Sequence, residues 1–155
     1  MTLGTDPVPR QVVGSKGHGI SMMRGLGLPV PPAFCITSEG VAMLDRIWTA
    51  ITDAVGRLEA ETSRRFGGGR QPLLLAVRSS GTTSMPGMLR SILNVGITDT
   101  VHAELTRLYG STVSRDLRQR LQQHLPQADH ENPYDQLRLA IESVATSGNS
   151  ARAIA

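Results

Sequence analysis

The stretch PLLLAVRSSGTTSMPGMLRSILNVGI, residues 72–97, determines how the rest of this chain is interpreted. Residues 73–77 form an unbroken apolar run that follows a proline and ends at a charged residue, Arg78. This pattern is typical of a strand buried on both faces, so it predicts that Arg78 emerges at a strand end. Residues 91–97 return to an apolar, strand-like pattern.

Small polar residues connect the two expected strands. Residues 79–84 comprise five hydroxyl-bearing residues and one glycine, whose N–H and O–H groups are candidates to surround an anion. Pro86 and Gly87 then predict a rigid turn in which the glycine can take a positive φ or let a ligand approach the backbone. An ordinary hairpin with a long polar loop is the alternative, and this stretch alone does not choose between them.

A second candidate phosphate site is GSKGHG, residues 14–19. Apolar residues at roughly helical spacing follow it, which predicts a glycine-rich turn leading into a helix N-terminus, where amides and the helix dipole favour phosphate. The spacing is not that of a Walker A motif, and a plain turn is the simpler interpretation. However, Lys16 is the only lysine among sixteen basic residues, which makes it a candidate wherever a compact, flexible ammonium is needed.

Helical patterns dominate the remaining sequence. A short buried strand is expected at residues 33–37, followed by a long helix that Thr37 or Ser38 caps. Beyond the second strand-like run the pattern is helical, with a break at Gly110 and a last helix that starts around Pro133. These signals predict an α/β (α+β) chain with a mixed sheet and flanking helices.

The length of 155 residues suits one compact domain or part of one. We expect an α/β core over residues 1–97 and a small helical subdomain over residues 98–155. Cys35 is the single cysteine, and its apolar neighbours predict a buried, structural thiol in a reducing compartment. The four histidines have no neighbours that suggest catalysis or metal binding.

Composition argues against two classes of partner. The net charge is only +3, the arginines are scattered and there are five aromatic residues, so no nucleic-acid-binding pattern emerges. No apolar run approaches the length of a membrane span, and the N-terminal residues show no secretion signal. We therefore expect a cytoplasmic protein without a nucleic-acid or membrane partner.

Three blocks of the sequence resemble, in the family's order, the first ATP-grasp lobe of the pyruvate, phosphate dikinases. They are residues 14–37, with Gly14-x-Lys16-Gly17 and the later GLPVPPAFCIT; residues 76–94, with AVRSS, SMPGM and LN; and residues 132–153. Phosphoenolpyruvate synthases and rifampicin phosphotransferases share the Val-Arg-Ser part but usually carry an acidic segment in place of SMPGM. The segment from 98 to 131 is shorter than the family's helical insert, and Ser15 replaces a usual glycine.

The resemblance implies a nucleotide site in which cations hold the ATP phosphates and a loop covers them. The implied ATP-binding residues are Lys16, Arg78, Thr82, Thr83, Ser84, Met85 and Gly87. It also implies Mg²⁺, whose ligands are expected from a second lobe that has no counterpart in these residues. The family's phosphohistidine motif is absent as well, so no catalytic residue and no metal ligand is expected in this chain.

The function implied by the resemblance is that of the ATP-binding part of a pyruvate, phosphate dikinase, which converts ATP, pyruvate and phosphate to phosphoenolpyruvate, AMP and pyrophosphate. We expect no turnover from residues 1–155 alone, and pyruvate and phosphate as ligands only in a complete enzyme. A partner chain or a homo-oligomer is one candidate source of the second lobe, and the sequence leaves open whether these residues are a truncated product, a gene fragment or a piece of a longer protein. Two alternatives stay open: a phosphoenolpyruvate synthase-like or antibiotic phosphotransferase fragment, and a non-catalytic nucleotide-binding or regulatory module.

Overall fold

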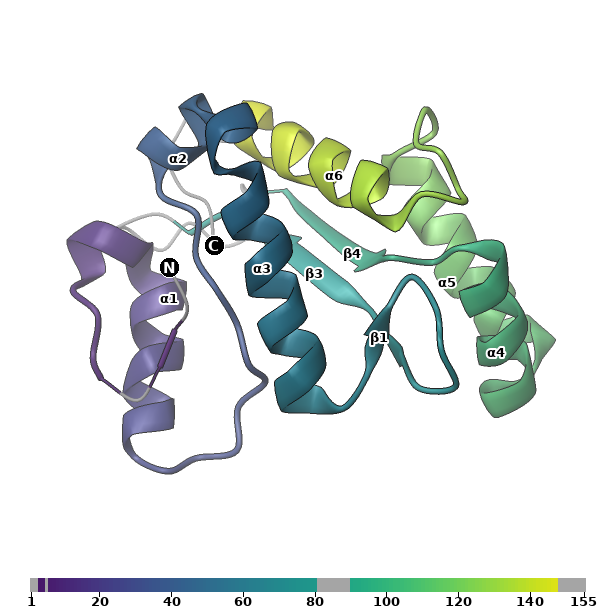
Figure 1. The fold of residues 1–155 in the computed structure, drawn as a ribbon, viewed down its shortest axis with the longest axis horizontal. Coiled ribbons are helices and arrows are strands. Elements are labelled where there is room, and N and C mark those ends of the chain that lie inside the picture. Colours follow the sequence, from purple (N-terminus) through teal and green to yellow (C-terminus); the bar gives the residue numbers. More distant parts are fainter. Residues whose placement is uncertain (1–2, 5, 81–89, 148–155) are drawn as a thin grey trace. The chain divides into compact units, whose positions relative to one another are not determined.

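A computed structural model describes residues 3–4, 6–80 and 90–147 (Figure 1). Its helices are α1 (Arg10–Gly25), α2 (Ser38–Ala42), α3 (Leu44–Thr62), α4 (Asp99–Tyr109), α5 (Ser111–His124) and α6 (Pro133–Ser147). Its strands are β1 (Arg65–Phe66), β2 (Pro72–Leu73), β3 (Leu75–Arg78) and β4 (Ser91–Val95). The described residues divide into two compact units: unit 1 contains residues 3–4, 6–58, 78–80, 90 and 144–147, and unit 2 contains residues 59–77 and 91–143. The α+β class is therefore confirmed.

A small apolar core in unit 1 lies beside α1. Leu3, Val13 and Cys35 are each 1% exposed and pack together, and the Leu3 amide donates to the Ala33 carbonyl at 3.0 Å. Burial raises the pKa of the Cys35 thiol, because the thiolate would be desolvated there. The prediction that Cys35 is buried is confirmed. The strand expected at residues 33–37 is reduced to an isolated bridge at Phe34.

The long helix expected after Thr37 is divided into α2 and α3. Thr37 caps α2 as predicted, because its Oγ1 accepts a hydrogen bond from the Gly40 amide at 3.2 Å. Met43, with φ −118° and ψ 35°, then ends α2 one residue before α3 begins. Within α3 of unit 1, Leu44, Ile51 and Val55 are buried, at a spacing that places them on one face of the helix.

The sheets of unit 2 are smaller than the sequence suggests. The run 73–77, expected to be one strand buried on both faces, is divided between β2 and β3, and Ala76 is exposed. This expectation is wrong because the two halves of the run have different partners. β2 pairs in parallel with β1, whereas β3 pairs with β4. Arg78 is nevertheless the last residue of β3, as predicted.

The helices of unit 2 follow the predicted pattern. Thr98 caps α4 by accepting the Val101 amide hydrogen at 3.2 Å, and its hydroxyl donates to the Gly67 carbonyl at 3.0 Å. Gly110, with φ 88°, separates α4 from α5. The two helices pack against each other, and α5 also packs against β4. Asn132 caps α6 by accepting the Tyr134 and Asp135 amide hydrogens, each at 3.1 Å.

Buried Gln136 connects α6 to the residues that follow β4. Its Oε1 accepts the Gly96 amide hydrogen at 2.9 Å, and its Nε2 donates to the Ile97 carbonyl at 3.1 Å and the His130 carbonyl at 3.3 Å. The side chain is 0% exposed, so its amide satisfies backbone groups that water does not reach.

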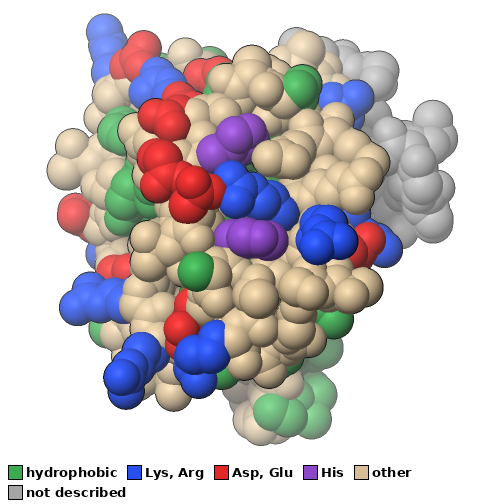
Figure 2. Space-filling model, turned by 90° about the vertical axis from the view of Figure 1, so that its right-hand side faces the viewer, with side chains coloured by type: hydrophobic (Ala, Val, Ile, Leu, Met, Phe, Trp, Pro, Cys, Tyr) green, Lys and Arg blue, Asp and Glu red, His purple; other side chains and the backbone are tan. Residues whose placement is uncertain are grey.

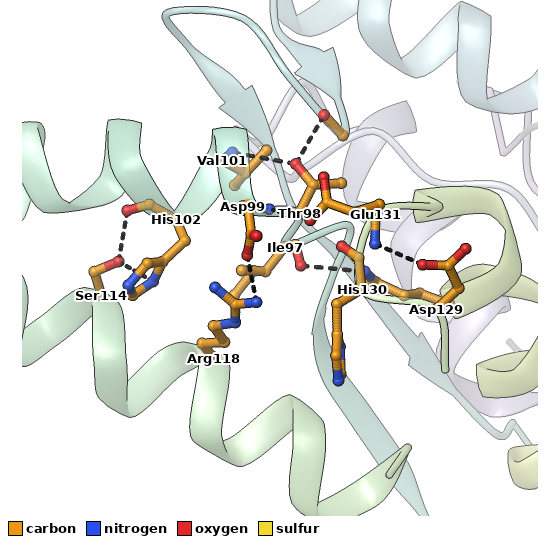
Figure 3. A network of polar contacts seen from close by, with 12 residues as sticks. Ile97, Thr98, Asp99, Val101, His102, Ser114, Arg118, Asp129, His130 and Glu131 are labelled. Atoms are coloured by element: carbon orange, nitrogen blue, oxygen red, sulfur yellow. Dashed lines mark hydrogen bonds and ion pairs between the residues drawn. The ribbon is translucent and has the colours of Figure 1, made fainter. Parts of the chain in front are cut away.

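Polar contacts around the start of α4 form a network within unit 2 (Figure 3). Arg118 of α5 pairs with the Asp99 carboxylate, and the Ser114 hydroxyl donates to the His102 carbonyl at 2.8 Å while its oxygen lies 2.7 Å from the His102 Nδ1. Figure 2 shows basic, acidic and histidine side chains side by side on one face. Both signs of charge are therefore mixed on that face.

Removing Arg118 from its pair with Asp99 is expected to change the pKa of the Asp99 carboxyl measurably. The hydrogen bond from Arg118 and then its charge hold the pKa of the Asp99 carboxyl below its usual value. The folded-state pKa is thus below the unfolded one, so the contribution of this pair to stability is lost as the pH falls through the Asp99 pKa. In Arg118→Met, carboxyl-carbon NMR titration should show the Asp99 pKa returned toward its usual value.

Arg120→Met is the matched control for that titration. Arg120 lies on the same helix but pairs with Asp116, at 2.8 Å, so its removal should leave the Asp99 titration unchanged. An Asp99 pKa that stays low in Arg118→Met would show that the pair is not its cause.

Candidate functional site

The first candidate segment lies on α1, which is interrupted at Gly14. This residue has φ 69° and ψ −178°, a combination that is essentially restricted to glycine, whereas the following residues to Gly25 are helical. The glycine-rich turn expected over residues 14–19 is therefore confined to Gly14. Gly17 and Gly19 are accommodated within the helix, so Lys16 lies in the first turn after the interruption.

Two hydrogen bonds hold Lys16 against the residues that follow β3. Its amide donates to the Ser80 hydroxyl oxygen at 3.0 Å, and its ammonium Nζ donates to the Ser79 carbonyl at 2.8 Å. The first bond satisfies one of the amides that a helix start leaves without an intrahelical partner. Ser80 thus acts as an N-cap contributed by a segment 64 residues away.

Gly14 also permits the close approach of this segment to α1. A Cβ atom on Gly14 would lie 2.4 Å from both the Ser80 carbonyl oxygen and its hydroxyl oxygen. Ser79 and Ser80 are themselves buried, at 0% and 5% exposure. Among the described residues, the Ser79 hydroxyl has no hydrogen-bond partner.

The electrostatics of this arrangement favour an anion. Arg78 directly precedes Ser79 and is exposed at the end of β3. Partial desolvation of the Lys16 ammonium, and then the positive charge of Arg78, lower the Lys16 pKa. The positive charges of Lys16 and Arg78 repel each other, and an anion bound to both would stabilise both. We therefore treat this pair as a candidate anion site.

The structure brings together two of the residues expected to bind ATP, Lys16 and Arg78. The other candidates, Thr82, Thr83, Ser84, Met85 and Gly87, lie outside the described residues. Sequence reasoning missed the contacts of Ser79 and Ser80 with α1. The available signal was the hydroxyl run directly after Arg78, which we interpreted only as a possible anion-binding loop.

Other candidate chemistry is limited within residues 3–4, 6–80 and 90–147. No group of three or more histidine, cysteine, aspartate or glutamate side chains there has an arrangement that could hold a metal ion. In the same part of the chain, no helix combines the length and apolar character needed to cross a bilayer. The His18 ring has a structural contact instead, with its Nδ1 2.7 Å from the Val8 carbonyl.

Comparison with known proteins identifies pyruvate, phosphate dikinases as relatives of this chain. Pyruvate, phosphate dikinase 2 of Zea mays is 34% identical over 115 residues, which cover 69% of this chain and 13% of that protein. The pyruvate, phosphate dikinases of Rickettsia bellii and Rhizobium meliloti are each 39% identical, over 107 and 103 residues, covering 62% and 61% of this chain. This chain spans only 12% of each of those two proteins. No protein-family profile matches the sequence.

Proposed function

This chain is related to the pyruvate, phosphate dikinases, and on that basis we propose that it forms the ATP-binding N-terminal part of such an enzyme. Residues 1–97 would form the core of a first ATP-grasp lobe and residues 98–155 a helical subdomain leading toward a second lobe. The complete enzyme would convert ATP, pyruvate and phosphate to phosphoenolpyruvate, AMP and pyrophosphate. We place it in the cytoplasm.

One observation carries this proposal. Lys16 bonds to Ser79 and Ser80, residues 63 and 64 positions away that directly follow Arg78. In unit 1, the Lys16 ammonium therefore contacts Ser79, the residue that follows Arg78 in the sequence. Lys16 itself lies near the start of a helical turn. Neutralising phosphate charge in this way is most of what phosphoryl transfer requires of a protein.

The proposed roles follow from the chemistry of the two cations. Lys16 is a compact donor suited to one or two phosphate oxygens, whereas Arg78 offers a planar fork that can bind two oxygens of one phosphate. Mg²⁺ would arrive with the nucleotide and neutralise further phosphate charge. By the family resemblance, its protein ligands would come from a second lobe. For Thr82–Gly87, the support is the sequence resemblance.

The proposal is tested by calorimetric titration of Mg-ATP into the purified chain. Lys16→Ala and Arg78→Ala should each weaken binding about tenfold or more, because each removes a charge-assisted hydrogen bond worth about 1.5–3 kcal/mol. Arg46→Ala is the control: it removes one positive charge from an exposed site on α3 of unit 1 and should change the Kd less than about twofold. Residues 1–155 alone should form no AMP from ATP, pyruvate and phosphate.

The outcomes separate the alternatives. If all three substitutions weaken binding equally, the effect is one of net charge and the site assignment is wrong. If a folded chain binds no Mg-ATP, the nucleotide role is contradicted for residues 1–155. AMP production by this chain would contradict the expected lack of turnover.

A further inference from the structure

Hydrogen bonds hold both the backbone amide and the side-chain ammonium of Lys16, and the bond to the amide comes from Ser80. The Ser80 hydroxyl accepts the Lys16 amide hydrogen at 3.0 Å, while the Ser79 carbonyl accepts from Nζ at 2.8 Å. A nucleotide site built from Lys16 and Arg78 does not by itself require the first contact, because the Lys16 amide could bind water or a ligand oxygen instead.

We propose that Ser80 is a positioning residue for Lys16: its buried hydroxyl caps the turn of α1 that presents the ammonium to a polyphosphate. This inference rests on the proposed nucleotide-binding function and adds a determinant of affinity that does not itself touch the ligand. Arg78 and Ser80 flank the Ser79 carbonyl in sequence. Residues 78–80 therefore supply the Arg78 cation and also the two oxygen atoms that accept hydrogen bonds from Lys16.

The physical basis is preorganisation. A free lysine side chain loses up to about 2 kcal/mol of rotamer entropy when it is immobilised, and a site that is already ordered does not pay this on binding. An ammonium carries three donors, so one bond to Ser79 leaves two for phosphate oxygens. Lys16 can thus remain anchored while it binds a ligand.

The geometry around Ser80 shows how closely it approaches α1. Ser80 is 5% exposed, and its carbonyl and hydroxyl oxygens both lie where a Cβ on Gly14 would project. Ser79 provides the matched comparison, since it is adjacent and also buried but its hydroxyl has no partner among the described residues. Only the Ser80 hydroxyl should therefore matter to Lys16.

Lys16 can be observed selectively, because it is the only lysine in the chain. Lysine labelled with ¹³C at Cε gives one side-chain NMR signal, whose titration reports the Lys16 pKa and whose shift reports Mg-ATP binding. In Ser80→Ala we expect the Lys16 pKa to rise toward its usual value as the ammonium is released to solvent, and the Kd for Mg-ATP to rise about tenfold. In Ser79→Ala both quantities should stay unchanged within about twofold in Kd.

Three results decide the inference. A rise in pKa in Ser80→Ala but not Ser79→Ala supports it even if no form of the chain binds Mg-ATP, in which case only the proposed function fails. Equal effects of the two substitutions, or no effect of Ser80→Ala, overturn the positioning role. If Ser80→Ala does not fold, amide hydrogen exchange in the unsubstituted chain decides: slow exchange at Lys16 supports the cap, and exchange at the rate of a free amide overturns it.

Discussion

Gly14→Ala is expected to destabilise unit 1 by about 3 kcal/mol and to weaken Mg-ATP binding about 100-fold. The backbone at Gly14, φ 69° and ψ −178°, costs a residue with a side chain about 1–3 kcal/mol. The new Cβ would also lie 2.4 Å from the Ser80 oxygens, and such overpacking costs a further 1–3 kcal/mol or so. Displacing Ser80 would release both bonds to Lys16, so affinity and stability should fall together.

Denaturant unfolding followed by tryptophan fluorescence measures the first effect. Trp48 is the only tryptophan in the chain and lies on α3 within unit 1, so its signal reports that unit. Calorimetry measures the second effect.

Gly19→Ala is a matched control for this substitution. Gly19 lies on the same helix, and a Cβ there would meet no atom within 4 Å. Alanine at that position should leave stability unchanged or increase it by up to about 1 kcal/mol, because glycine is a poor helix former. Gly14→Ala that behaved like Gly19→Ala would contradict the close packing of Ser80 on α1.

Gln136→Leu is expected to destabilise unit 2 by about 3 kcal/mol. Leucine has a similar size but leaves the Gly96 amide and the Ile97 carbonyl, both buried, without the partners that the glutamine provides. Each buried backbone group that loses its hydrogen bond costs about 1–3 kcal/mol. The measurements are urea unfolding followed by circular dichroism and hydrogen exchange at the Gly96 amide, which should become much faster.

Gln123→Leu makes the same chemical change at an exposed position of α5. Its effect on stability should stay within about 0.5 kcal/mol, as is usual for surface substitutions. Equal stability of the two variants would mean that water replaces the Gln136 contacts and that residues 96–97 are not sealed from solvent.

Much of the helical structure was predictable because its signals are local. Thr37 caps a helix as expected, and Thr98 does so by the same local rule, since a hydroxyl needs only the amides two or three residues later. The break at Gly110 and the start of α6 at Pro133 depend on equally local backbone preferences. The division of residues 73–77 between two strands was not predictable, because an unbroken apolar run contains no information about which strand each half will pair with.

The sequence by itself determined the two cations of the candidate site and the kinship with pyruvate, phosphate dikinases. Lys16 stands out as the single lysine, and Arg78 as the charge that ends an apolar run. Only the tertiary structure decided that Ser80 caps the turn carrying Lys16 and that Gly14 makes room for it. A contact between residues 64 positions apart has no local signature, because it arises when packing brings together two segments that each look like an ordinary turn or loop.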